Sequence, residues 1–149
     1  MADLATLHDH VADQLTQLDQ RYTSGRRQLI ETLSAIGNPA TLPDILLAAP
    51  DLTQSSAYRN LDVLERSGVI RRLATSHDYA HYELAEPLLG HHHHLICVQC
   101  ESITDVHLDH ETEEFVLARL HNAAQDHGFT PIDHTLDLHG ICRSCTAKA

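Results

Sequence analysis

The chain has 149 residues, a hydrophobic content of 42% and a formal net charge of −11 with its 14 histidines neutral. That length allows one buried core or two small ones, and no apolar stretch approaches the length of a membrane-spanning helix. The acidic balance argues against a nucleic-acid partner, because phosphate contacts need cationic side chains. Between residues 54 and 72, however, four arginines outnumber two acidic residues, so a small basic face is compatible with DNA.

Four helices are predicted in the first seventy residues. Apolar residues at helical spacing predict a helix in the first twenty residues. A second helix is expected over 22–37, with Thr23 as N-cap and Gly37 at its end, and a third over 42–49, which Pro50 ends. Thr53 can cap a fourth helix that runs to about residue 67.

The third and fourth helices are predicted to form a helix-turn-helix. Ala57, Leu61 and Leu64 make a buried stripe on the fourth helix and leave its N-terminal end polar, where base edges would be met in a major groove. Strand-like runs at 69–73 and 79–84 suggest a hairpin wing around residues 75–78. An ordinary helical hairpin with solvated arginines is the alternative. Residues 1–86 are therefore expected to form a winged-helix domain with an N-terminal helical extension.

Residues 87–90 are predicted to be a hinge, and residues 91–149 a second, α/β domain. Strands are expected at 92–98, 103–108 and 134–141, with a helix over about 111–128 whose apolar side includes Phe115, Val116 and Leu120. The fold class of the whole chain is therefore predicted to be α+β.

The four cysteines form two pairs, Cys97-x-x-Cys100 and Cys142-x-x-Cys145. Two such pairs place four thiolates within reach of one tetrahedral ion, which predicts a structural zinc site. A redox dithiol would need only one pair at the start of a helix, and disulfides would suit a secreted protein with an N-terminal leader, which this sequence does not show. We therefore expect a cytoplasmic protein with one four-cysteine zinc site and no membrane partner.

Four consecutive histidines, His91 to His94, directly precede the first cysteine pair. In an extended strand, His92 and His94 point to one face and His91 and His93 to the other, so one run can serve two metal sites. Carboxylates or further histidines must complete each set of ligands. Glu83 and Asp105 are candidates beside His92 and His94, in a site that would span both domains. His81, on the same strand face as Glu83, and nearby His77 are further candidates, with wing-surface histidines as the alternative.

These motifs together resemble the ferric uptake regulator family. The resemblance is carried by Thr23-x-x-Arg26, Ser56-Ala57-Tyr58-Arg59-Asn60-Leu61, Tyr82-Glu83-Leu84, the block from His91 to Cys100, and His134-Thr135-Leu136 before Gly140-x-Cys142. It implies a winged-helix domain, a hinge and a dimerisation domain, in a homodimer that represses metal-homeostasis genes when metal is bound.

The resemblance also implies roles for individual residues. Glu83, His92, His94 and Asp105 match the sensory metal site, although the family's further histidine after the second helix is replaced here by Asn38-Pro39-Ala40-Thr41. His91, His93 and His134 match a second site, usually completed by a helix carboxylate, for which Glu111, Glu113 and Glu114 are candidates. The implied DNA-binding residues are Arg26, Ser55, Ser56, Tyr58, Arg59 and Asn60.

The predicted function is a metal-dependent transcriptional repressor that binds pseudo-palindromic double-stranded DNA, since a two-fold dimer reads a two-fold site. Zinc is slightly favoured over iron as the second, regulatory metal. Iron, nickel and peroxide sensing within the family are alternatives, although the peroxide branch typically has Asp where this chain has Glu83. Metal storage or trafficking would leave the polar end of the fourth helix unused. No enzyme or small-molecule substrate is expected, because the sequence has no H-E-x-x-H helix.

Overall fold

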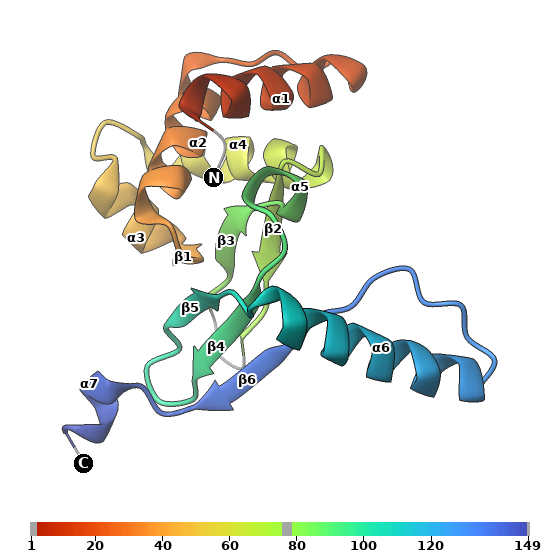
Figure 1. Cartoon of the computed structure of the whole chain (residues 1–149). Coiled ribbons are helices and arrows are strands. Elements are labelled where there is room, and N and C mark those ends of the chain that lie inside the picture. Colours follow the sequence, from red (N-terminus) through yellow and green to blue (C-terminus); the bar gives the residue numbers. More distant parts are fainter. Residues whose placement is uncertain (1–2, 76–78, 149) are drawn as a thin grey trace. The chain divides into compact units, whose positions relative to one another are not determined.

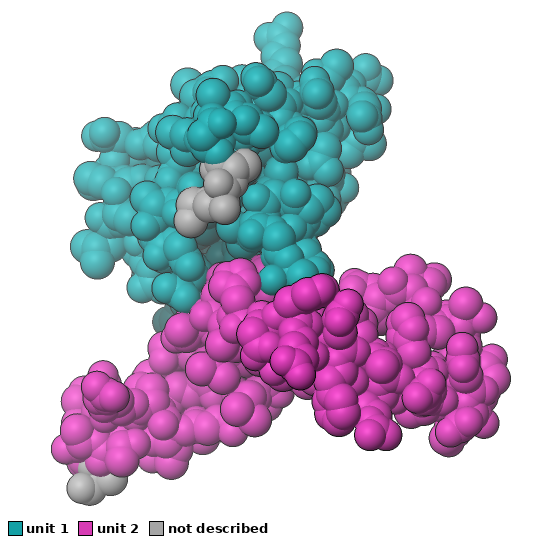
Figure 2. Space-filling model, viewed as in Figure 1, with its two compact units in different colours: residues 1–91 teal, residues 92–149 magenta. Residues whose placement is uncertain are grey.

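The computed structural model of the chain describes residues 3–75 and 79–148. It contains two compact units, Met1–His91 and His92–Ala149 (Figure 2). The predicted candidate His77 and the tip of the predicted hairpin lie outside the described residues. Among the described residues, no helix is long and apolar enough to cross a bilayer.

The helices of the first unit begin where the sequence offers capping side chains. They are α1 (Leu4–Gln17), α2 (Ser24–Ile36), α3 (Leu42–Ala48) and α4 (Gln54–Arg66). Thr23 and Thr53 accept hydrogen bonds from the first turns of α2 and α4, and Thr41 forms a capping box with Asp44. Gly37, at φ 71°, ends α2 in the left-handed conformation.

The core of the first unit is built from the apolar stripes of these helices. Leu29, Ile30, Ile45, Leu61 and Leu64 are completely or almost completely buried. In the view of Figure 1, α2 and α4 lie between α1 and a small sheet. The predicted stripe of α4 is confirmed, because its buried residues are Ala57, Leu61 and Leu64. The stripe therefore leaves the opposite side of α4 to solvent.

A three-stranded antiparallel sheet completes the first unit. It contains β1 (Ala40–Thr41), β2 (Ile70–Leu73) and β3 (His81–Leu84) in the order β1-β3-β2. The two-residue strand β1 was not predicted, because two residues carry no periodic pattern. The short helix α5 (Glu86–Leu89) occupies most of the segment expected to be a hinge, with Pro87 in its first turn, where proline is tolerated.

The second unit is a three-stranded sheet with one long helix. The strands are β4 (His93–Cys97), β5 (Ile103–Val106) and β6 (Asp137–Gly140) in the order β5-β4-β6, and the helices are α6 (His110–Asp126) and α7 (Arg143–Thr146). β4 pairs antiparallel with β5 and parallel with β6 (Figure 1). The predicted α+β class is thus confirmed, although β6 begins three residues later than expected.

The apolar side of α6 is not covered within the second unit. No residue of this helix is buried, and Phe115 is 60% exposed. Leu138 of β6 and the following Ile141 are also more than half exposed. The sequence pattern of α6 would suggest burial inside the domain, but these side chains form an open apolar surface of the kind that partner proteins cover.

Candidate metal centres and nucleic-acid interface

The two cysteine pairs meet at the ends of β4 and β6 and form a four-cysteine cluster. The Sγ atoms of Cys100 and Cys142 lie 3.7 Å apart, and the sulfurs of the four cysteines all lie within 4.8 Å of one another. Zinc held by thiolates at about 2.3 Å gives a tetrahedron with edges of about 3.8 Å. Disulfide sulfurs would be separated by only about 2.05 Å, and all four thiols are free. The cysteine positions therefore fit a closed tetrahedral ion.

Hydrogen bonds around this cluster favour the thiolate form of two of its four cysteines. Backbone N–H groups of Cys100, Cys142 and Gln99 donate to Cys97 and lower the pKa of its thiol to about 6. Hydrogen bonds from Ser102 likewise lower the pKa of Cys100. Cys145 behaves in the opposite way, because its hydrogen bonds with the sulfurs of Cys142 and Cys100 raise its pKa to about 12. A metal ion that binds here would have to displace the proton from Cys145, whereas the thiol of Cys97 already loses its proton at about pH 6.

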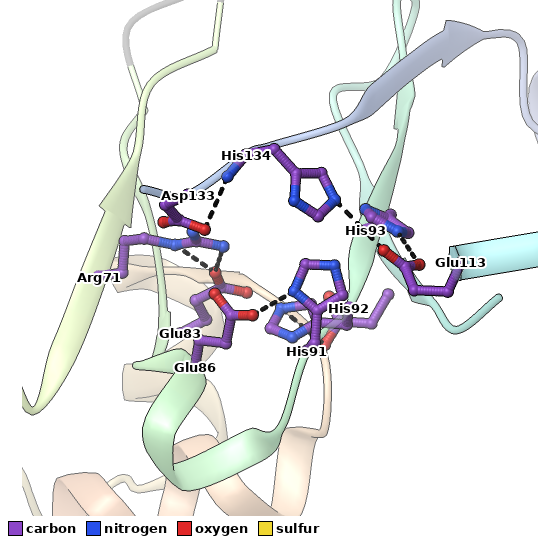
Figure 3. Close-up of polar contacts among 10 residues, drawn as sticks. Arg71, Glu83, Glu86, His91, His92, His93, Glu113, Asp133 and His134 are labelled. Atoms are coloured by element: carbon purple, nitrogen blue, oxygen red, sulfur yellow. Dashed lines mark hydrogen bonds and ion pairs between the residues drawn. The ribbon is translucent and has the colours of Figure 1, made fainter. Parts of the chain in front are cut away.

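His93, Glu113 and His134 form a first nitrogen- and oxygen-donor cluster inside the second unit (Figure 3). Nε2 of the buried His93 lies 2.8 Å from Oε2 of Glu113, and Nε2 of His134 lies 3.3 Å from Oε1 of the same carboxylate. Of the three predicted helix carboxylates, only Glu113 faces this cluster. Glu111 is exposed, and Glu114 pairs with His110 at 3.4 Å on the solvent side of α6.

His92, His94 and Asp105 form a second cluster on the other side of the same strand segment. Nε2 of His94 lies 3.8 Å and Nε2 of His92 3.9 Å from the carboxylate of Asp105, which stands opposite His94 in the β4–β5 register. The alternation predicted for the histidine run thus separates His92 and His94 from His93. Two imidazoles and a carboxylate suit zinc, iron and nickel alike.

Asp137 is a neighbour of this cluster that the sequence did not reveal. Its Oδ1 lies 3.0 Å from Nδ1 of His94, because the parallel register of β4 and β6 places the two residues side by side. A carboxylate on one ring nitrogen orients the other toward a metal. No local pattern could have identified Asp137, since the pairing joins segments 43 residues apart.

Glu83, His81 and His91 belong to the first unit. Glu83 is almost completely buried on β3, where Nε and Nη2 of Arg71 on β2 donate to its Oε1 at 2.8 and 2.6 Å (Figure 3). His81, also on β3, is 5% exposed, so it is not a wing-surface histidine. Nδ1 of His91, the last residue of the unit, contacts the carboxylate of Glu86. The pairing of Glu83, His81 and His91 with the clusters of the second unit stays a prediction.

Five of the six predicted DNA-binding residues, all except Arg26 on α2, lie on the N-terminal half of α4. Tyr58 is 52% exposed, and Ser55 and Arg59 are exposed beside it. This surface offers an aromatic ring, hydroxyl groups and a guanidinium, which are the groups that contact thymine methyls, phosphates and guanine edges.

Arg26 and Asn60 have a more internal role than the sequence suggested. Nε of Arg26 donates to Oδ1 of Asn60 at 3.3 Å, and Nδ2 of Asn60 lies 3.3 Å from Oγ of Ser56. The other end of the Arg26 guanidinium donates to the backbone oxygen of Arg21 at 2.5 Å. These contacts tie the start of α2 to α4 and so help to fix the orientation of the exposed face of α4.

The arrangement of this chain agrees with the ferric uptake regulator family, whose family model matches residues 17–139. The chain belongs to the ferric uptake regulator family. It is 36% identical over 94 residues to a ferric uptake regulation protein of Synechococcus elongatus, an alignment that covers 63% of this chain and 60% of that relative. A ferric uptake regulation protein of Campylobacter jejuni is 32% identical over 138 residues, with coverage of 88% and 83%. The resemblance predicted from the motifs is thus confirmed.

The fold of this family member also matches a solved structure of the Helicobacter pylori ferric uptake regulator. The TM-score is 0.76 at 23% sequence identity, and the match covers 97% of this chain and 95% of the other. The chain spans less than two thirds of the length of the Synechococcus relative. The fold is therefore established by comparison.

Proposed function

We propose that the chain is a metal-dependent DNA-binding repressor that acts as a homodimer on pseudo-palindromic double-stranded DNA. The observation that supports this most strongly is the histidine run at the start of the second unit. Within three residues, His92 to His94 supply imidazoles to two separate carboxylate-containing clusters. In our proposal the four-cysteine cluster holds a structural zinc ion, and the histidine clusters hold divalent metal that controls DNA binding.

Glu83 connects metal binding to the DNA-binding unit in this proposal. The carboxylate belongs to the winged-helix unit, whereas His92, His94 and Asp105 belong to the second unit. If all four bind one ion, binding free energy favours those arrangements of the two units in which Glu83 reaches the ion. His81 is a further candidate ligand, because it lies two residues from Glu83 on β3. In the same way, His91 of the first unit would bind the metal ion held by the cluster of His93, Glu113 and His134 in the second unit.

The open apolar surface of the second unit supports the proposed homodimer. Phe115 and Leu120 on α6 and Leu138 on β6 expose apolar side chains that the unit itself does not cover. A two-fold dimer buries the same surface of both copies and presents two recognition helices. Each α4 would then read one half-site of a pseudo-palindrome through Tyr58 and Arg59.

Zinc is the regulatory metal that we favour, and iron is the alternative. Imidazole-rich sites bind zinc more tightly than ferrous iron when both are equally available. Both histidine clusters contain two imidazoles and one carboxylate within one unit. The iron alternative is supported by the relatives, since the Synechococcus and Campylobacter proteins are named ferric uptake regulation proteins.

The proposal is tested by DNA binding at buffered free metal concentrations. Fluorescence anisotropy of labelled palindromic promoter DNA should show affinity rising with free zinc at lower concentrations than with ferrous iron under anaerobic conditions. His92→Ala and Asp105→Ala should each abolish the metal response, while His110→Ala, on the solvent side of α6, should preserve it. Equal DNA affinity with the histidine clusters loaded and empty would refute metal control, and a response to iron alone would favour the alternative.

A further inference from the structure

We propose that Arg71 is an internal counter-cation that competes with the regulatory metal for Glu83 and thereby sets the metal concentration to which the protein responds. The inference rests on the proposed role of Glu83 as a metal ligand. Arg71 and Glu83 stand directly opposite each other in the antiparallel β2–β3 register. Two nitrogens of the guanidinium, Nε and Nη2, donate to the same oxygen, Oε1, at 2.8 and 2.6 Å (Figure 3).

The burial of the carboxylate explains why it needs such a partner. The Glu83 side chain is 2% exposed, and an ionised carboxylate at that depth is strongly destabilising unless a positive charge and hydrogen bonds compensate it. In the metal-free protein, Arg71 supplies both. The fold can therefore keep a buried ligand carboxylate in place before metal arrives.

The same contact must oppose metal binding. A cation that approaches Glu83 meets a carboxylate whose charge is already balanced, and its attraction to that carboxylate is reduced by the guanidinium beside it. The Arg71 side chain is 31% exposed, in contrast to that of Glu83. The guanidinium can therefore move toward water while its aliphatic part stays on the sheet. Metal binding at Glu83 thus becomes an exchange of one cation for another.

The neighbouring Arg72 provides a matched control. It carries the same charge one residue along β2, stands opposite Tyr82 in the sheet register and is exposed. Because side chains alternate along a strand, Arg72 points away from the face that holds Arg71 and Glu83. Removal of either arginine changes the net charge of the protein equally, but only Arg71 contacts the ligand carboxylate.

The test is a zinc titration of the full chain, loaded in advance at the four-cysteine cluster, in competition with a chromophoric chelator. The variants are Arg71→Met, Arg71→Lys, Arg72→Met, Glu83→Gln and the double variant Arg71→Met with Glu83→Gln. The quantity compared among the variants is the zinc affinity of one site, namely the site whose affinity falls in Glu83→Gln. Arg71→Met should tighten this site by at least roughly tenfold, because it removes both hydrogen bonds to Glu83, and the loss of one charge-assisted hydrogen bond alone corresponds to about tenfold. Arg72→Met should stay within about twofold of the wild type. Arg71→Lys keeps the charge but not the two-donor guanidinium, so its zinc affinity should lie between those of the wild type and Arg71→Met.

Two further readouts separate the possible outcomes. Thermal unfolding should show that Arg71→Met lowers the Tm of the protein without regulatory metal more than the Tm with it, and in the double variant the Arg71 change should no longer affect zinc affinity. Unchanged or weaker zinc binding by Arg71→Met, with Glu83→Gln clearly impaired, would overturn the counter-cation role and leave the proposed function intact. Wild-type zinc binding by Glu83→Gln would instead remove Glu83 from the metal site, and both the counter-cation role of Arg71 and the proposed ligand role of Glu83 would fall.

Discussion

Replacement of Glu113 by glutamine should selectively weaken the metal cluster of His93 and His134. The carboxylate of Glu113 lies 2.8 Å from the His93 ring and 3.3 Å from the His134 ring, and His93 is 1% exposed. Glutamine keeps the size of the side chain but removes the negative charge and one acceptor. A charge-assisted contact to a buried group contributes about 1.5–3 kcal/mol, which corresponds to a loss of metal affinity of roughly 10- to 160-fold.

The adjacent Glu114 offers the control for this experiment. Its side chain is 69% exposed and pairs with the exposed His110, so Glu114→Gln should change metal affinity by less than about twofold. The assay is a competition titration with a zinc chelator on chains already loaded at the four-cysteine cluster, with circular dichroism to show that both variants are folded. Equal metal affinity of the Glu113 and Glu114 variants would refute the assignment of Glu113 as a metal ligand.

Three further predictions concern the recognition helix, the core and the thiols. Tyr58→Ala should weaken binding to palindromic DNA by roughly tenfold without lowering the Tm, since the ring is 52% exposed; a matching fall in Tm would show a structural role instead. Leu61→Ala, at a site that is 1% exposed, should destabilise the first unit by about 2–5 kcal/mol in urea unfolding, whereas Leu47→Ala, at 85% exposure, should change stability by less than about 0.5 kcal/mol. Because the pKa of Cys97 is lowered to about 6, this thiol needs no deprotonation above that pH, and zinc affinity of the four-cysteine cluster should fall by an additional factor of about ten per unit as pH decreases below it. Chelator competition between pH 5 and 8 measures this change, and an unaltered slope across pH 6 would contradict it.

The main helices could be predicted because their signals are local. Thr23 and Thr53 cap α2 and α4 as expected, and Gly37 ends α2, since these roles depend only on side-chain hydrogen bonds and backbone freedom within one turn. The strand β1 and the helix α5 escaped prediction. Each is only two to four residues long, which is too short for a periodic pattern, and β1 also depends on the pairing of Ala40 with the distant Tyr82.

The apolar residues of α6 show where periodicity misleads. Their spacing indicates a face that will be covered, but it does not identify the covering surface. In this chain no residue of the helix is buried, and Phe115 remains mostly exposed. Burial of an apolar face lowers the free energy equally well against the same chain or against another copy, so the sequence pattern cannot distinguish the two.

Spacing alone determined that the two cysteine pairs could meet around one ion and that adjacent histidines would face opposite ways, because both follow from chain geometry over a few residues. Only the tertiary structure selected Glu113 among three neighbouring carboxylates, placed Asp137 against His94, and set Arg71 on Glu83. Those choices depend on helix rotation and strand register, which arise from packing between residues that are distant in the chain. The residue types that can bind metal could thus be recognised from the local sequence. The carboxylates that accompany the histidines, and the arginine that balances the charge of Glu83, were decided by the fold.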